Sequence, residues 1–234
     1  MSQKTDLKVA VFDLDGTLCT QDSFKTYLRI RVFKSPYQWI LLFPILWWML
    51  LTYVIRIKNN DWLKIKTIGL VCGGISSEEA EHDADILIRS LNWNQELLTI
   101  IEQCHENDVV TILATASPQI YVDFIKYHFG FEHALSTRMK QDTSGKWTGD
   151  VLGHNCYGEE KKNQISAWRK QNNLYWQNMA LFSDSIADLP SFKKVGLPIA
   201  VQPKLQLRRS MAHFGIIPLR DAMKKFKQLD KPLL

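Results

Sequence analysis

An uncharged run of 21 residues, from Ser35 to Ile55, constrains this chain more than any other feature. It lies between Lys34 and Arg56 and contains the segment QWILLFPILWWMLLTYVI. About 20 apolar residues are enough to cross the hydrocarbon core of a bilayer. By length and composition, the run could therefore be a membrane anchor, a buried pair of helices, or a lipid-binding surface.

Pro44 interrupts this run. Proline removes one helical hydrogen bond and clashes with the preceding turn, and it pushes the residue before it, Phe43, away from helical geometry. We therefore expect a shorter piece from about Tyr37 to Phe43 and a longer one from Ile45 to Arg56. Neither piece is long enough to span a bilayer alone.

Positive charge gathers around the same run. Eight basic residues and one acidic residue lie between Ser23 and Ser77, a net charge of +7, whereas the whole chain carries +5. The aromatic residues lie inside the apolar run rather than among the charges, which favours an anionic membrane surface over nucleic acid. We expect such a membrane surface as a partner and no nucleic acid, with a solvated basic face as the alternative. The sequence leaves the oligomeric state open.

Apolar strands alternate with helical segments outside this region. Strands are expected at residues 9–12, 108–117, 179–185 and 196–203, with helices at 94–107, 117–130 and 159–172 and a hairpin around Ser144-Gly145. The helix at 117–130 should have Ser117 as N-cap, Pro118 at N1 and Gly130 at its end. This alternation predicts an α/β fold with a Rossmann-like parallel sheet, whose catalytic loops lie at the carboxyl ends of the strands.

Residues 22–91 do not alternate in this way and have a helical pattern throughout. We therefore predict a core made of residues 1–21 and 92–234, with an inserted all-α cap at 22–91 that contains the apolar run.

Asp13 and Asp15 follow the first expected strand directly, in the segment DLDGTL. Paired acids repel each other, so that a pKa rises or a cation is needed. Burying two carboxylates at the end of an apolar strand is costly without a purpose. This pair is therefore the first candidate for an active site.

Other polar groups are expected at the same edge of the sheet. Thr115 ends the second strand, Lys161 begins a later helix, and Asp184 and Asp188 follow another strand. Each has an ordinary structural interpretation, as strand filler, solvated lysine or helix cap. Their combination at these positions indicates chemistry instead.

This set resembles the haloacid-dehalogenase (HAD) superfamily of phosphohydrolases. Its first motif is matched by Asp13-Leu14-Asp15-Gly16-Thr17, and its later motifs by Thr115, by Lys161, and by Asp184 with Asp188. The inserted segment has the position of the small helical cap in the phosphoserine-phosphatase-like branch of that superfamily. Ser183 departs from the pattern, because many relatives have glycine there.

The resemblance implies a Mg²⁺-dependent phosphatase that forms an aspartyl-phosphate. Asp13 would be the nucleophile and Asp15 the general acid and base. Mg²⁺ would be held by Asp13, by the backbone carbonyl of Asp15 and by Asp184, and Asp188 would orient Lys161 or a metal-bound water. The phosphoryl oxygens would be bound by Gly16, Thr115, Ala116 and Lys161. Lys162 is the alternative to Lys161.

A finer resemblance is to the phosphatidylglycerophosphatase C enzymes, membrane-associated HAD enzymes that dephosphorylate phosphatidylglycerol phosphate in bacterial phospholipid synthesis. The segments that carry it are FDLDGTLCTQDSF, ATASPQ, YGEEK and SDSIADLP. It implies a lipid phosphomonoester substrate and a location on the cytoplasmic side of the inner membrane. The alternative is a soluble cytoplasmic phosphatase for a small phosphomonoester such as a phosphoserine-like compound.

The four cysteines have no CxxC spacing, which suits free thiols in a reducing compartment.

The order of the motifs limits what the apolar run can do. Asp13 precedes it, while Thr115 and Asp184 follow it. A single crossing would place these groups on opposite sides of a bilayer, so no site could form. We therefore expect a re-entrant or interfacial element, with packing inside a soluble cap or a double crossing as alternatives. The residues expected at the headgroup boundary are aromatic: Trp39, Trp47, Trp48 and Tyr53.

Overall fold

The computed structural model describes residues 7–35, 37, 40, 44, 47–49, 51, 54 and 60–222. Among these residues, every helix is too short or too polar to cross a membrane. Pro44 is helical and exposed. Its neighbours Phe43 and Ile45 lie outside the described residues, so the break expected at Pro44 stays a prediction.

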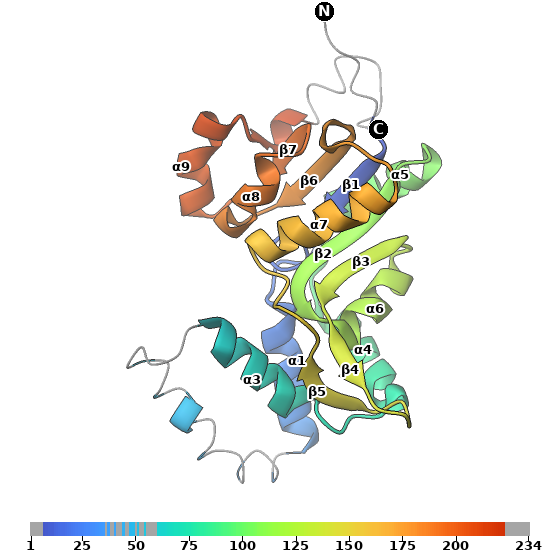
Figure 1. Ribbon diagram of the computed structural model, residues 1–234, viewed down its shortest axis with the longest axis vertical. Helices are drawn as coiled ribbons and strands as arrows, with labels where there is room; N and C mark the ends of the chain where they lie inside the picture. Colours follow the sequence, from blue (N-terminus) through green and yellow to red (C-terminus); the bar gives the residue numbers. More distant parts are fainter. Residues whose placement is uncertain are drawn as a thin grey trace, which may run out of the picture.

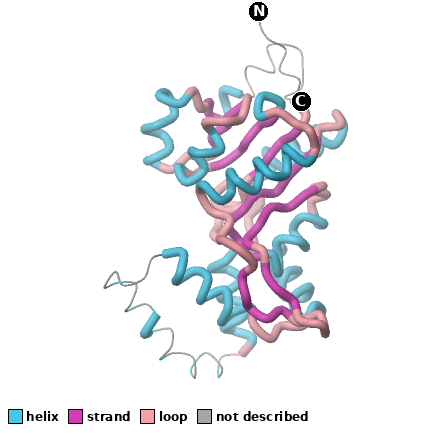
Figure 2. The backbone as a smooth tube through the Cα atoms, in the orientation of Figure 1, coloured by secondary structure: helices cyan, strands magenta, loops and turns pink. Residues whose placement is uncertain are grey.

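A parallel sheet of six strands forms the centre of the core (Figures 1 and 2), in the order β3-β2-β1-β6-β7-β8. The strands are β1 (Val9–Phe12), β2 (Val110–Pro118), β3 (His133–Thr137), β6 (Met179–Ser183), β7 (Leu197–Ala200) and β8 (Ile217–Pro218). This arrangement confirms the predicted α/β class with a parallel sheet. Because β1 lies between β2 and β6, the loops after these three strands meet at one edge.

Helices cover both faces of the sheet, and the side chains of β1 alternate between the two layers. Ala10 and Phe12 pack on one side, where Phe12 stacks on Phe182 of β6 with ring centroids 4.6 Å apart. Val9 and Val11 pack on the other side. The first side is covered by α5 (Gln95–Glu106) and α6 (Gln119–His128), and the second by α7 (Glu159–Gln171), α8 (Leu189–Phe192) and α9 (Leu205–Phe214).

The described part of the inserted region is helical, as predicted, and comprises α1 (Ser23–Lys34), α3 (Asn60–Cys72) and α4 (Ser77–Ser90). Arg31 and Lys34 of α1 bind Asp83 of α4 at 2.8 and 3.0 Å, and the Asp83 side chain is fully buried. A buried carboxylate needs such partners. The pairs therefore fasten α1 to α4. The exact division into core residues 1–21 and 92–234 and cap residues 22–91 stays a prediction.

A two-stranded antiparallel hairpin, β4 (Met139–Gln141) and β5 (Trp147–Val151), lies on α3 (Figure 1). The Gly74 N–H donates to the Trp147 carbonyl at 2.7 Å. A Cβ on Gly149 would lie 2.6 Å from the Gly69 carbonyl oxygen, so only glycine allows this close contact between helix and strand. The hairpin, which belongs to the predicted core, thus packs against a helix of the predicted cap.

The helix expected to begin at Ser117 begins later, and Ser117 as its N-cap was wrong. Strand β2 continues through Pro118, which pairs with Thr137 of β3, and α6 starts at Gln119 with Pro118 as N-cap. The Ser117 hydroxyl instead donates to Asp15 at 2.8 Å. The sheet pairing and this bond to a carboxylate outweigh the capping preference of serine.

Candidate active site

Asp13 follows β1 and lies at the carboxyl end of the sheet. Its backbone N–H donates to the Phe182 carbonyl of β6 at 2.9 Å, and the residue is only 7% exposed. Burial raises the pKa of Asp13 to about 7; the charge of Lys161 opposes the rise and that of Asp188 adds to it. A carboxyl group in such a place needs positive charge beside it to ionise.

Lys161 supplies that charge from the first turn of α7. Its Nζ lies 2.8 Å from Asp13 Oδ1 and 3.0 Å from Asp188 Oδ2. The lysine is 3% exposed, and although burial lowers its pKa, the two carboxylates raise it above the ordinary value. The Ser183 hydroxyl donates to Asp188 Oδ2 at 2.5 Å and so holds the second acid in place. Lys162, the alternative, binds Glu159 near the surface.

Asp15 is held through both of its carboxylate oxygens. The Ser23 N–H, at the start of α1, lies 2.6 Å from Oδ1, and the Ser117 hydroxyl lies 2.8 Å from Oδ2. The Ser23 hydroxyl also contacts the hydroxyls of Ser117 and Tyr121, each at 3.0 Å. The sequence analysis did not predict this network, because Ser117 was interpreted as a helix cap and Ser23 was given no role.

Thr115 is fully buried in β2, and its hydroxyl accepts the Ser117 N–H at 3.1 Å. The carbonyl of Ala116 accepts the Thr137 hydroxyl at 2.8 Å. These bonds fix the end of β2. Thr115 and Ala116 therefore directly precede Ser117, the residue of β2 whose hydroxyl donates to Asp15.

Thr17 joins two of the acids, and its place among the site residues was not expected. Its hydroxyl donates to Asp13 Oδ2 at 3.4 Å and accepts the Asp184 N–H at 3.0 Å. The signal was available, because Thr17 lies within the segment DLDGTL.

Gly16 and Asp184 come into close contact across the same edge. Gly16 has a φ of +79°, and a Cβ there would lie 2.3 Å from Asp184 Oδ2. Glycine therefore permits both the left-handed turn and the approach of the two loops. Burial raises the pKa of Asp184, and an ion pair with Lys204 opposes this rise.

The donor set around Asp13 and Asp184 fits Mg²⁺, which prefers oxygen ligands. Asp184 Oδ1 is buried and has no hydrogen-bond partner among the described residues, although buried polar atoms are normally paired. The described residues hold no group of three or more His, Cys, Asp and Glu side chains placed for a metal. A site here would therefore combine two side-chain carboxylates with a backbone carbonyl, as expected for Asp15.

The amino end of α3 approaches the site from the cap. Asp61 accepts a hydrogen bond from Asn155 Nδ2 at 2.8 Å, and Asn155 Oδ1 accepts the Thr137 hydroxyl at 3.0 Å. Lys64, one turn further along α3, has its pKa lowered by burial, while the charges of Asp15 and Asp22 oppose this shift. The helix thus carries a partly buried lysine that interacts electrostatically with these acids.

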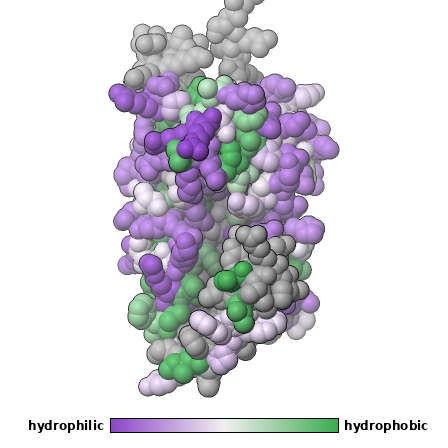
Figure 3. Space-filling view, turned by 90° about the vertical axis from the view of Figure 1, so that its left-hand side faces the viewer, coloured by the Kyte–Doolittle hydropathy of each residue, from purple (hydrophilic) through white to green (hydrophobic). Residues whose placement is uncertain are grey.

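Two of the four aromatic residues expected at a membrane, Trp39 and Tyr53, lie outside the described residues. Trp47 is 61% and Trp48 is 56% exposed. The Trp48 ring packs edge-on against Trp62 of α3, with ring centroids 6.1 Å apart. Figure 3 shows hydrophobic surface among the atoms at the lower end of the molecule.

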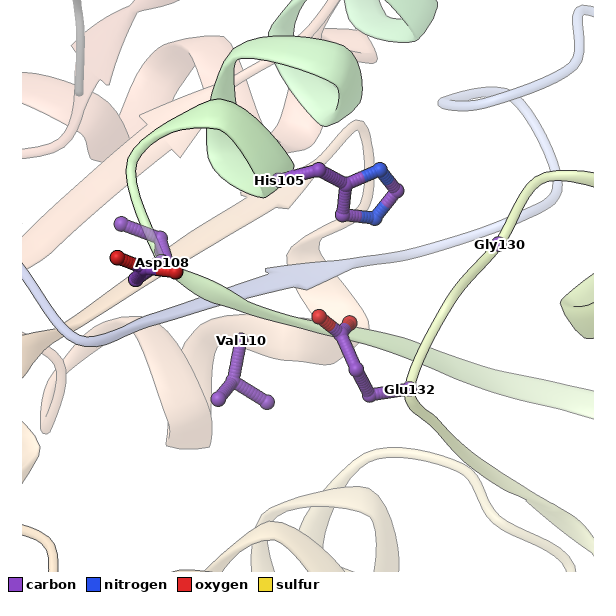
Figure 4. A pocket seen from close by; sticks show the side chains of 6 residues that line it. His105, Asp108, Val110, Gly130 and Glu132 are labelled. Carbon is purple, nitrogen blue, oxygen red and sulfur yellow. The ribbon is translucent and has the colours of Figure 1, made fainter.

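A separate hollow of about 460 Å³ opens beside the amino end of β2 (Figure 4). It is lined by His105, Asp108, Val109, Val110, Gly130 and Glu132. Glu132 accepts the Thr111 N–H at 2.7 Å, so it serves to hold this strand. None of the candidate catalytic residues lines this hollow, which lies at the opposite end of the strand from Thr115.

Part of the chain is similar in sequence to a protein described as a probable phosphatase. A probable phosphatase of Mycobacterium tuberculosis is 36% identical over 108 residues, which are 46% of this chain and 36% of that protein. The match thus spans little more than a third of that relative's length.

Two solved structures share the fold. A protein of unknown function from Bordetella pertussis has a TM-score of 0.76 at 21% identity, over 92% of this chain and 98% of that chain. A substrate-bound phosphoserine phosphatase has a TM-score of 0.65 at 20% identity, over 94% of this chain and 98% of that chain.

Residues 10–193 match the haloacid dehalogenase-like hydrolases as a family. This match covers most of the chain, and it includes every acid and lysine of the first four motifs described above. The chain therefore belongs to the haloacid dehalogenase-like hydrolase family.

Proposed function

We propose that the chain is a Mg²⁺-dependent phosphomonoesterase that forms an aspartyl-phosphate on Asp13, and that its substrate is a lipid phosphomonoester of the phosphatidylglycerol phosphate type. The observation that carries the proposal is the buried contact of Lys161 with Asp13 at 2.8 Å and with Asp188 at 3.0 Å. It provides a carboxylate nucleophile and a cation that are both buried at the same edge of the sheet.

In the first step, a carboxylate oxygen of Asp13 attacks phosphorus. The new bond forms as the bond to the ester oxygen breaks, and the leaving oxygen takes a proton from Asp15. Water then attacks the phosphorus of the aspartyl-phosphate and gives a proton to Asp15, so that phosphate leaves and Asp13 is restored. Asp15 is thus used first as an acid and then as a base.

The environment of Asp15 suits this double role. Donors from the ends of β2 and α1 hold both of its oxygens, so the carboxyl keeps one orientation through both steps. A fixed acid needs little reorganisation when the proton moves.

Lys161 would neutralise charge on the phosphoryl oxygens, and the Thr115 hydroxyl would donate a hydrogen bond to one of them. The lysine is fixed by Asp188, and Asp188 is fixed by the Ser183 hydroxyl, so the charge stays in place as the transition state forms. Asp13, Asp184 and the Asp15 backbone carbonyl would hold Mg²⁺. When bound, Mg²⁺ supplies positive charge that stabilises the phosphoryl group in the transition state.

The lipid assignment is supported by the surface beside the amino end of α3. Trp47 and Trp48 are exposed, and Trp48 packs on Trp62, which follows Asp61 in α3. Asp61 in turn binds Asn155, which lies shortly before the helix of Lys161. An apolar surface flanked by basic residues could hold acyl chains and anionic headgroups while the phosphate reaches Asp13.

The second candidate is a soluble phosphatase for a small phosphomonoester such as phosphoserine. Its support is the shared fold with phosphoserine phosphatase. Lys64 of α3 interacts electrostatically with Asp15 and Asp13. Such a cation could bind a second anionic group of either substrate, so it does not separate the two candidates.

A substrate comparison tests the proposal. Phosphate release is measured with Mg²⁺ from phosphatidylglycerol phosphate in mixed micelles, from phosphoserine and from p-nitrophenyl phosphate. We expect kcat/KM to be about a hundredfold higher for the lipid than for phosphoserine. The reverse order would favour the soluble enzyme, and no hydrolysis of any of the three would contradict phosphatase activity.

Flotation with vesicles tests the membrane part separately. We expect the protein to float with vesicles rich in phosphatidylglycerol, and the double variant Trp47→Ser/Trp48→Ser to remain largely in the soluble fraction. Tyr175→Ser is the matched control, because Tyr175 is 70% exposed and lies far along the chain from the apolar run. A wild-type protein that stays soluble with anionic vesicles would contradict membrane contact.

A further inference from the structure

Lys204 belongs to none of the four motifs and lies against Asp184. Its Nζ is 2.6 Å from Asp184 Oδ2, and its backbone N–H donates to the Asp184 carbonyl at 3.0 Å. The two side chains differ in exposure, with Lys204 67% and Asp184 3% exposed. A flexible surface lysine thus places its charge on a buried acid of the active site.

The Lys204 ammonium also interacts electrostatically with Asp13 and Asp15. Burial lowers the pKa of Lys204, but the hydrogen bond and charge of Asp184, with the charges of Asp13 and Asp15, raise it above the ordinary value. These three acids are the residues that would hold Mg²⁺. Lys161 differs, because it is buried and fixed between Asp13 and Asp188.

We propose that Lys204 competes with the divalent cation for Asp184 and so sets the metal affinity of the active site. The inference rests on the proposed function, because it assumes that Asp184 is a metal ligand. It adds a residue of this chain that no motif assigns.

The competition follows from charge. An ammonium and a divalent cation that share one carboxylate repel each other strongly where water is partly excluded. Lys204 is on an exposed, flexible stem and can swing into solvent, whereas Asp184 cannot. Metal binding would therefore break the ion pair, and that cost would weaken the apparent affinity for the metal.

A purely positioning role predicts the opposite effect. If Lys204 mainly oriented Asp184 for the metal, its removal would weaken binding. However, the Lys204 N–H already binds the Asp184 carbonyl, and the Asp184 N–H binds the Thr17 hydroxyl. These contacts would remain in a Lys204→Met variant, so the carboxylate should keep its place.

The test measures the Kd of Mn²⁺ for the metal-stripped protein by isothermal titration calorimetry, in the absence of substrate. Lys204→Met keeps the length of the side chain and removes its charge, while Lys204→Arg keeps the charge. Lys194→Met is the matched control, since Lys194 is an exposed lysine on the turn before β7. We expect the Kd for Mn²⁺ to fall at least about tenfold in Lys204→Met and to change less than about twofold in the other two.

Salt provides a second readout. Because the Lys204 side chain is largely exposed, added NaCl should screen its charge and narrow the difference between wild type and Lys204→Met. An unchanged or higher Kd in Lys204→Met would overturn the inference while leaving the proposed function intact. A wild-type protein that binds no Mn²⁺ would overturn both.

Discussion

The Ser117 hydroxyl donates to Asp15 Oδ2 at 2.8 Å and thereby joins the end of β2 to the loop that follows β1. The other oxygen of Asp15 accepts the Ser23 N–H from the first residue of α1. One carboxyl group therefore connects the central sheet to α1. Any role of Asp15 in moving protons depends on this pair of contacts.

Ser117→Ala should lower kcat about tenfold to a hundredfold and leave KM within about twofold, because it removes a hydrogen bond to a charged group. The fold should remain, since the hydroxyls of Ser23 and Tyr121 still contact each other at 3.0 Å. Steady-state kinetics on p-nitrophenyl phosphate measures both constants. Ser90→Ala is the control, because its exposed hydroxyl binds only a carbonyl of its own helix. An unchanged kcat would show that Ser117 does not position Asp15.

Neighbouring lysines offer a matched pair. Lys161→Met should reduce kcat/KM at least about a thousandfold, because the buried charge beside Asp13 is lost. It should also destabilise the protein by about 3–5 kcal/mol, since Asp13 and Asp188 lose their shared partner. Lys162→Met, which breaks only a partly exposed pair with Glu159, should stay near wild type in both.

Asp188→Asn keeps that prediction testable if Lys161→Met does not fold. It preserves the volume of the side chain but weakens the hold on Lys161, so kcat should fall while circular dichroism stays unchanged. Equal activity of the Lys161 and Lys162 variants would contradict the assignment of the phosphate-binding lysine.

Gly16→Ala should destabilise the protein by about 2–4 kcal/mol and weaken Mn²⁺ binding. The added methyl group would meet Asp184 Oδ2 at 2.3 Å and would also strain a φ of +79°. Gly153→Ala is a close control, because Gly153 has the same φ but nothing within 4 Å of the added Cβ. It should cost only about 1–2 kcal/mol of conformational strain. Equal loss in the two variants, measured by urea unfolding, would show that the approach of Gly16 to Asp184 is unimportant.

Acid should weaken the contact between α1 and α4. Hydrogen bonding to Arg31 lowers the pKa of Glu79, burial opposes this shift, and Lys34 adds to it. Because the folded-state pKa lies below the ordinary value of 4.5, the contribution of Glu79 is complete above that pH and is lost as the pH falls through the folded-state pKa. The effect is modest, since water screens a partly exposed pair.

Thermal unfolding between about pH 5 and pH 3 measures this contribution. The wild-type protein should lose more stability over this range than the Glu79→Gln variant. Glu78→Gln is the control: Glu78 is an exposed neighbour of Glu79, and this variant should lose as much stability as the wild type. Parallel curves for wild type and Glu79→Gln would contradict the role assigned to Arg31.

Four of the six strands of the sheet, β1, β2, β6 and β7, and the meeting point of the acids could be predicted from the sequence, because they depend on local patterns, whereas β3 and β8 were not predicted. Val9–Phe12 is a short apolar run followed by two acids, and strand alternation places Asp13, Thr115 and Asp184 at the same edge. The parallel sheet followed from the same alternation. The resemblance of the motifs to those of the haloacid-dehalogenase superfamily then gave each motif residue an expected role.

The contacts that depend on tertiary approach could not be predicted. Ser117 has the sequence of a helix cap, and only the pairing of Pro118 with Thr137 turns its hydroxyl toward Asp15. Lys204 follows β7 by a short turn, and its contact with Asp184 depends on how the β6 and β7 loops fold over the sheet. In both cases, a polar side chain had several possible partners in the sequence, and the packing of the sheet brought it to an acid of the candidate site.

A covalent phosphoryl group on Asp13 tests the central claim most directly. Protein mixed with p-nitrophenyl phosphate and Mg²⁺ is quenched in acid within a single turnover, digested and examined by mass spectrometry. The account predicts that the peptide containing Asp13 gains the mass of one phosphoryl group, and that neither this gain nor product appears in Asp13→Asn. Product formation by Asp13→Asn, or a phosphoryl group on a different residue of the wild type, would contradict it.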